Sequence, residues 1–262
     1  MAYPILLIHG MGFRDNSLFN YWGRIPKMLK QMGFEVYYGG QDSNGTTKTN
    51  GTVIAKRIEE IIRTTGCEKL NIIAHSKGGI DARYAISSLG MGKYVATLTT
   101  VSTPHNGSVT VDKLLKAPDI LVRFVAKCSD IWLRILGDKY PDAYSVFHSF
   151  TTAAAEKFNR ENPDHEGVRY RSYAFVMKNA SSDLFLWFPN LIVSHFEGEN
   201  DGLLAPRAVM WGEFMGIQRS CVRRGISHCD EVDMRRQKFS RTPGDGVSNI
   251  LDVYREIAES LP

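Results

Sequence analysis

The sequence predicts an α/β protein in which helices cover both faces of a mostly parallel sheet. Two observations indicate this fold class: strand-like and helix-like segments alternate over the first hundred residues, and the strand-like segments are almost continuously apolar. Strands of a parallel sheet have this pattern because helices bury both of their faces. With 262 residues, 43% of them hydrophobic, the chain is long enough for one large domain or a domain with an insertion.

The spacing of apolar residues places the elements of this fold. Strands are expected over residues 4–9, 34–38, 70–74, 96–102, 170–177 and 191–196. Helices are expected over residues 18–32, 52–64 and 247–261. Gly33 lies just past the first of these helices, where a glycine commonly ends a helix.

From Ser108 to about Asn162 the alternation stops and the sequence becomes helix-like and unusually apolar. Pro118 and Gly137 divide this stretch into segments. Two interpretations remain open, namely ordinary helix packing in the core and a mobile cap over a site. The expected organisation is a core of residues 1–107 and 163–262, interrupted by a helical lid or cap at residues 108–162.

Composition excludes several classes of protein. The net charge is +4 and the basic residues are scattered, so no nucleic-acid partner is expected. No apolar run approaches the ~18 residues that a transmembrane helix needs. Residues 4–9 read as a core strand and not as a signal peptide, so we expect a cytoplasmic protein or the mature part of a secreted one. Four irregularly spaced cysteines predict neither a disulfide framework nor a zinc site.

The ten residues from Leu70 to Gly79, LNIIAHSKGG, join an apolar strand to a helical pattern through a tight turn. Such a turn lifts Ser76 out of the sheet and exposes its hydroxyl beside the positive end of the helix. The usual pattern for this turn is G-x-S-x-G, and here Ala74 replaces the first glycine. Ser76 is therefore a candidate nucleophile, and the alternative is a serine that only caps the helix.

A serine nucleophile needs a base, and the base needs an acid that orients it. His228 lies in a polar loop shortly before the C-terminal helix and is the candidate base. His195, within the apolar pattern of residues 191–196, is interpreted as structural. Asp201 follows that predicted strand in a turn and is the candidate acid, with Glu199 as a nearby rival. The Asn-Asp-Gly sequence around Asp201 is also ordinary turn chemistry.

An oxyanion hole needs two backbone N–H groups directed at the developing negative charge. The turn itself supplies one, from Lys77. The loop after an early strand should supply the other, and the N–H of Met11 in His9-Gly10-Met11 is the natural donor.

With these residues assembled, the sequence resembles the bacterial triacylglycerol lipases and esterases of the α/β-hydrolase superfamily. The matching stretches occur in the family's order and are YPILLIHGMGF (3–13), LNIIAHSKGGIDARY (70–84), VSTPHNGS (101–108), FEGENDGL (196–203) and SHCDEVD (227–233). The resemblance implies an α/β-hydrolase fold with a helical lid. It also implies a catalytic triad of Ser76, Asp201 and His228, with Met11 and Lys77 as oxyanion donors.

The resemblance also implies a candidate structural calcium site. Secreted lipases of this family often hold calcium near the loop of the catalytic histidine, between one carboxylate of that loop and a second upstream. Asp230 matches the first, and Asp183 is the nearest candidate for the second. The alternative is a pair of solvated acids. No cofactor is expected for the chemistry itself.

The expected function is hydrolysis of carboxylic esters through an acyl-enzyme, with acylglycerols as the first choice of substrate at a lipid–water interface. A carboxylesterase for short or medium chains is close behind. The same triad could serve an acyltransferase or an amidase, and a non-catalytic binding protein of the same fold is a further alternative. The sequence does not indicate an oligomeric state.

Overall fold

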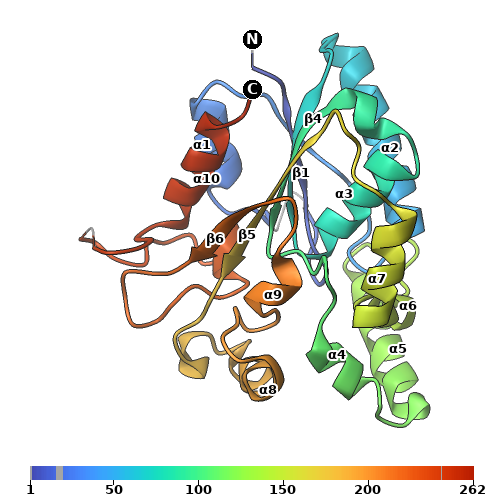
Figure 1. The fold of residues 1–262 in the computed structure, drawn as a ribbon, viewed down its shortest axis with the longest axis vertical. Helices are drawn as coiled ribbons and strands as arrows, with labels where there is room; N and C mark the ends of the chain where they lie inside the picture. Colours follow the sequence, from blue (N-terminus) through green and yellow to red (C-terminus); the bar gives the residue numbers. More distant parts are fainter. Residues whose placement is uncertain (1, 16–19, 243) are drawn as a thin grey trace.

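The computed structural model describes residues 2–15, 20–242 and 244–262, which form one parallel sheet of six strands (Figure 1). The strand order is β2-β1-β3-β4-β5-β6, and every neighbouring pair is parallel. The strands are β1 (Ile5–Ile8), β2 (Val36–Tyr38), β3 (Leu70–His75), β4 (Val95–Val101), β5 (Arg169–Phe175) and β6 (Glu213–Gln218).

The sheet has an apolar core on each face because successive side chains of a strand point to opposite sides. In β1, Ile5 and Leu7 belong to one core cluster, whereas Leu6 and Ile8 belong to the other. Helices α1 (Ile25–Gln31) and α10 (Ile250–Glu259) cover the first face, and α2 (Thr47–Thr65) and α3 (Lys77–Ser87) cover the second (Figure 1). This confirms the predicted α/β fold with helices on both faces.

The remaining helices lie mostly toward the end of the molecule away from both termini, and α7 runs beside the core (Figure 1). They are α4 (Val109–Leu114), α5 (Asp119–Ile135), α6 (Ala143–Ser149), α7 (Thr152–Glu161), α8 (Trp187–Glu197) and α9 (Pro206–Val209). The first four lie within residues 108–162. Of these, α7 is tied to the core by Asn159, whose side chain accepts a hydrogen bond of 2.7 Å from Arg83 of α3. Short 3₁₀ helices complete the chain at Met91–Tyr94, Ala180–Ser182 and Asp230–Val232.

One predicted element was wrong, one strand was missed and one helix was only partly correct. Residues 191–196 form part of α8 and not a strand, so His195 lies exposed on a helix and not within the sheet. The sixth strand is β6, whose partly exposed edge position gives it no continuous apolar run. Of the helix expected over residues 18–32, only Ile25–Gln31 is helical, and Leu18 lies outside the described residues.

Among the residues that the structure describes, no helix is both long and apolar enough to span a membrane.

Candidate active site

Ser76 lies at the junction between β3 and α3 with a left-handed backbone, φ 53° and ψ −132°. Such a conformation is strained for a residue with a side chain. It persists only where the surrounding packing enforces it. The packing here is close: a Cβ added to Gly78 would lie 2.5 Å from the carbonyl oxygen of His9. The glycine therefore permits the contact between α3 and the end of β1 that holds the turn.

The loop after β1 packs directly on the side chain of Ser76. A Cβ added to Gly10 would lie 2.7 Å from the Cβ of Ser76, so only glycine fits at position 10. The N–H of Gly10 donates a hydrogen bond of 3.0 Å to the hydroxyl of Tyr21. Met11 is the next residue after Gly10, and Lys77, directly after Ser76, is the first residue of α3. The two predicted oxyanion donors thus belong to segments that flank Ser76.

His228 and Asp201 form a buried pair. The Nδ1 atom of His228 lies 2.8 Å from Oδ2 of Asp201, and the backbone N–H of His228 donates to the carbonyl of Asp201 at 2.8 Å. The other carboxylate oxygen of Asp201 accepts from the N–H groups of Leu203 and Leu204, both at 2.8 Å. Burial alone would raise the pKa of Asp201, but the charge and hydrogen bond of His228 outweigh it, so this pKa lies below its ordinary value.

The loop of His228 meets the Ser76 turn through His75. The rings of His228 and His75 are in contact, with their centroids 4.4 Å apart and their planes tilted by 44°, and His75 immediately precedes the serine. This contact brings the loop of His228 to the residue that precedes the candidate nucleophile. By contrast, Glu199, the rival candidate for the acid, lies at the surface in an ion pair with Arg219 at 2.7 Å.

Glu231 is a second buried carboxylate behind the His228–Asp201 pair. Its Oε2 atom lies 3.1 Å from Nε2 of His75 and 3.8 Å from Nδ1 of His228. Burial, followed by the negative charge of Asp201, raises the pKa of Glu231 well above its ordinary value. The two histidines and Glu231 have the spacing of a metal site, but both nitrogens of His75 and Nδ1 of His228 already have hydrogen-bond partners. We therefore interpret them as a hydrogen-bonded network.

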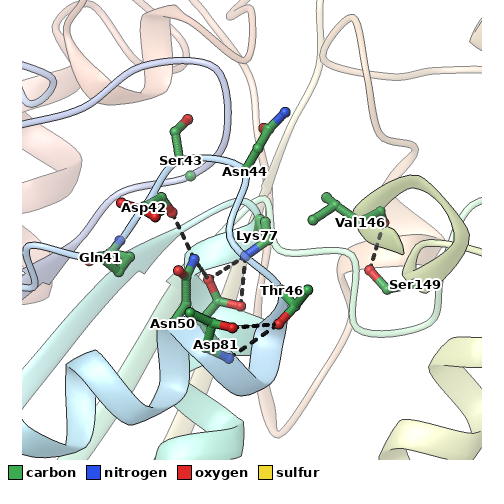
Figure 2. Close-up of polar contacts among 12 residues, drawn as sticks. Gln41, Asp42, Ser43, Asn44, Thr46, Asn50, Lys77, Asp81, Val146 and Ser149 are labelled. Carbon is green, nitrogen blue, oxygen red and sulfur yellow. Dashed lines mark hydrogen bonds and ion pairs between the residues drawn. The ribbon is translucent and has the colours of Figure 1, made fainter. Parts of the chain in front are cut away.

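The side chain of Lys77 is buried in an ion pair, away from any role as a free charge. Its amine contacts both carboxylate oxygens of Asp81, one turn further along α3, at 2.6 and 2.9 Å (Figure 2). Asn50 of α2 donates to the same carboxylate at 2.8 Å and to the carbonyl of Asp42 at 2.7 Å (Figure 2). The residue after the serine is thereby fixed to α2 and to the loop that follows β2.

The two predicted calcium ligands come together, but around arginine side chains. Asp183 and Asp230 share the hydroxyl of Ser227 as a donor, at 2.6 and 3.0 Å. Arg235 lies 2.7 Å from Asp183, and Arg224 lies 2.5 Å from Asp230. Two carboxylates already paired with two guanidinium groups do not fit a divalent cation, so the donor set disagrees with the implied calcium site.

Sequence reasoning missed Tyr21, Glu231 and the two arginines. The sequence did hold one indication of Glu231, because this residue lies only three positions after His228 in the same loop. Tyr21 left none, since the contact that gives it a role joins residues 54 positions apart.

Comparison with known proteins shows the family of this chain. The family model described as palmitoyl protein thioesterase matches residues 4–175, which include the Ser76 turn and the loop of Met11. The chain belongs to this family. The resemblance to lipases is also confirmed, because curated relatives are bacterial and yeast enzymes of that kind.

Two of these relatives cover nearly the whole chain. "Triacylglycerol lipase 2" of Saccharomyces cerevisiae is 28% identical over 256 residues, covering 92% of this chain and 73% of the yeast protein. "Triacylglycerol lipase" of Vibrio cholerae is 27% identical over 294 residues, covering 99% of this chain and 87% of the Vibrio protein. This chain is therefore an ester hydrolase with an α/β-hydrolase fold.

Solved structures agree on the fold. The mature form of Bacillus licheniformis lipase BlEst2 superposes with a TM-score of 0.69 at 21% identity, covering 89% of this chain and 88% of that one. Staphylococcus hyicus lipase superposes with a TM-score of 0.68 at 16% identity, covering 98% and 94%. These likenesses establish the α/β-hydrolase fold.

Proposed function

We propose that the chain hydrolyses carboxylic esters with Ser76 as nucleophile, His228 as general base and Asp201 as the orienting acid. Two observations carry the proposal, namely the 2.8 Å contact between Nδ1 of His228 and Oδ2 of Asp201 and the strained backbone of Ser76. Because Nδ1 donates to Asp201, Nε2 is the atom left to accept a proton.

The reaction has two steps. His228 accepts the proton of Ser76 at Nε2 while the hydroxyl oxygen attacks the ester carbonyl, and it then returns this proton to the departing alcohol as the C–O bond breaks. Water attacks the acyl-enzyme in the second step and gives its proton to His228, which passes it to Ser76 as the acid product leaves. Asp201 remains ionised throughout and stabilises the imidazolium.

The N–H groups of Met11 and Lys77 are the proposed oxyanion donors. A hole built from backbone groups requires rigid segments, and both segments here are fixed. Gly10 packs on Ser76 and bonds Tyr21, whereas the side chain of Lys77 is held by Asp81. Loss of one such donor typically lowers the rate by ~10²–10³.

The proposed substrates are acylglycerols, with residues 108–162 as the lid. The long helix α5 of this segment buries only Ala126 and Leu133, and most of its other large apolar side chains are exposed. A second exposed apolar group lies at the start of α8 and includes Phe185 and Phe188. Apolar surface on two helices beyond the carboxyl edge of the sheet suits contact with acyl chains or a lipid–water interface.

A chain-length series of p-nitrophenyl esters, an emulsified triglyceride and a long-chain acyl thioester would test the proposal. We expect turnover of the esters, its loss in Ser76→Ala, and full activity in Ser87→Ala, a matched change at the far end of the same helix. Retained turnover in Ser76→Ala would refute the triad. Activity confined to the thioester would refute the substrate class while leaving the triad in place.

A further inference from the structure

Two arginines and two buried carboxylates form a closed cluster around the loop that carries His228. Asp183 lies between β5 and α8, Asp230 follows His228 by two residues, and both carboxylates are almost fully buried. Arg235 bridges them, because its Nη2 lies 2.7 Å from Asp183 and its Nε lies 3.5 Å from Asp230. Arg224 contacts Asp230 from the other side.

Every carboxylate oxygen of the cluster has a partner within the protein. In Asp183, one oxygen accepts from the N–H of Phe185 at 3.0 Å and the other from Ser227 and Arg235. In Asp230, one oxygen faces Arg235 and the other accepts from Arg224 and from both the N–H and the hydroxyl of Ser227. Each of the four oxygens thus already faces an N–H, hydroxyl or guanidinium donor of the protein.

The nearest backbone oxygen is also taken. The carbonyl of Ser182 accepts from Nε of Arg224 at 2.9 Å and from Nη2 of Arg235 at 3.2 Å. Calcium in proteins takes six to eight oxygen ligands, and a ring of two carboxylates with a neighbouring carbonyl is a typical beginning of such a set. Here the two guanidinium groups bond all three acceptors, and their two positive charges balance the two negative ones.

We propose that Arg224 and Arg235 replace the calcium ion at this position, so that an internal ion-pair cluster holds the base loop. Guanidinium suits this role because it is always charged and its planar donors can bridge two carboxylates and a carbonyl at once. Ser227 joins the cluster to His228 as its immediate neighbour. The cluster is therefore a positioning device for the base, which rests on the proposed function of His228.

The first test uses the unmodified protein. The cluster predicts that isothermal titration with calcium alone gives no binding heat, and that neither calcium nor EDTA shifts the melting temperature or kcat. Calcium binding to the unmodified protein, or a fall in melting temperature with EDTA, would overturn the proposal. These binding and stability measurements, repeated in Ser76→Ala, do not depend on catalysis and thus separate this inference from the proposed reaction.

The second test removes the arginines. Arg224→Gln/Arg235→Gln leaves two unbalanced buried carboxylates, and we expect a fall in melting temperature of about 5 °C or more. We further expect measurable calcium binding and a drop in kcat of about tenfold with a smaller change in KM, both reversed in part by calcium. Arg223→Gln, a neighbouring arginine outside the cluster, should change none of these.

Arg235→Lys supplies a milder variant. It keeps the charge but cannot bridge both carboxylates, so kcat should lie between the unmodified protein and the double variant, and calcium should bind more weakly than to the latter. A double variant that folds, gains no calcium affinity and keeps its kcat would contradict the proposal. If the double variant does not fold, Arg235→Lys and the titration of the unmodified protein decide the question.

Discussion

The hydroxyl of Tyr21 lies 2.6 Å from Nδ1 of His75 and thereby joins the loop after β1 to the residue that precedes Ser76. Burial lowers the pKa of His75 well below its ordinary value, so the ring is neutral. A continuous set of hydrogen bonds runs through this ring. Gly10 donates to Tyr21, the hydroxyl of Tyr21 is bonded to Nδ1 of His75, and Nε2 of His75 is bonded to Glu231. These hydrogen bonds connect the proposed oxyanion loop to the loop of the proposed base, His228.

Tyr21→Phe should lower kcat by about tenfold with little change in KM. The substitution removes the acceptor of the Gly10 N–H and the hydrogen-bond partner of Nδ1 of His75, and losing one such hydrogen bond costs on the order of 1 kcal/mol. The loop that carries Met11 would then be held less firmly where the oxyanion develops. Steady-state kinetics with a soluble p-nitrophenyl ester measure the effect.

Tyr254→Phe is the matched control for this change. Tyr254 is also fully buried, but its hydroxyl has no hydrogen-bond partner in the described part of the chain. We expect unchanged kinetics and an equal or higher melting temperature, because the variant removes an unsatisfied polar group. Equal kinetic losses in both tyrosine variants would show that the effect is general and not due to the hydrogen bonds of Tyr21.

The parts of this site that sequence could predict are those encoded locally. The Ser76 turn is recognisable because a buried strand, a serine and two glycines are adjacent in sequence, and the close contact of Gly78 with His9 explains why those residues are small. Asp201 was predicted from the turn around it, although the element before it is a helix. Its role depends on the turn and not on the preceding element.

The rest depends on contacts between distant segments. Residues 191–196 are apolar without a clear period, so strand and helix could not be separated there. β6 lies at the sheet edge and is only half buried, and it shows no continuous apolar run. The arginines of the Asp183 cluster could not be recognised from sequence. Scattered basic residues are predicted to lie at the surface, and only the fold shows that these two contact carboxylates.

Asp201→Asn should reduce kcat by about 10², which is less than the ~10⁴ typical of losing the acid of such a triad. The reason is Glu231, whose carboxylate lies 3.8 Å from Nδ1 of His228. The negative charge of Asp201 is one cause of the raised pKa of Glu231, so its removal favours ionisation of Glu231 beside the base. Asp201→Asn/Glu231→Gln should lose the remaining activity, and a double variant no worse than Asp201→Asn would exclude this substitute role.

Glu231→Gln should stabilise the protein increasingly as the pH rises. Because the folded-state pKa of Glu231 is raised, the folded protein keeps a proton that the unfolded chain releases above about pH 4.5. The free energy of unfolding therefore falls with rising pH, by about 1.4 kcal/mol per pH unit for this group, until the folded pKa is reached. Glutamine has no such proton. Urea denaturation of both proteins at pH 5 and pH 8 tests this, and a difference that does not grow with pH would contradict the raised pKa.

Phe124→Ser/Ile131→Ser should separate lipid contact from the ester chemistry. Both side chains are more than half exposed and lie seven residues apart on the same face of α5, so the double variant should fold normally. If this face meets the lipid surface, removing two large apolar side chains should lower activity on an emulsified triglyceride by about tenfold. Turnover of soluble p-nitrophenyl acetate should not change, since both side chains are exposed to solvent on α5. Val53→Ser replaces an exposed apolar side chain on α2 and is the control for the general effect of such a replacement. Equal losses on the two substrates would show that α5 supports the active site and does not contact lipid.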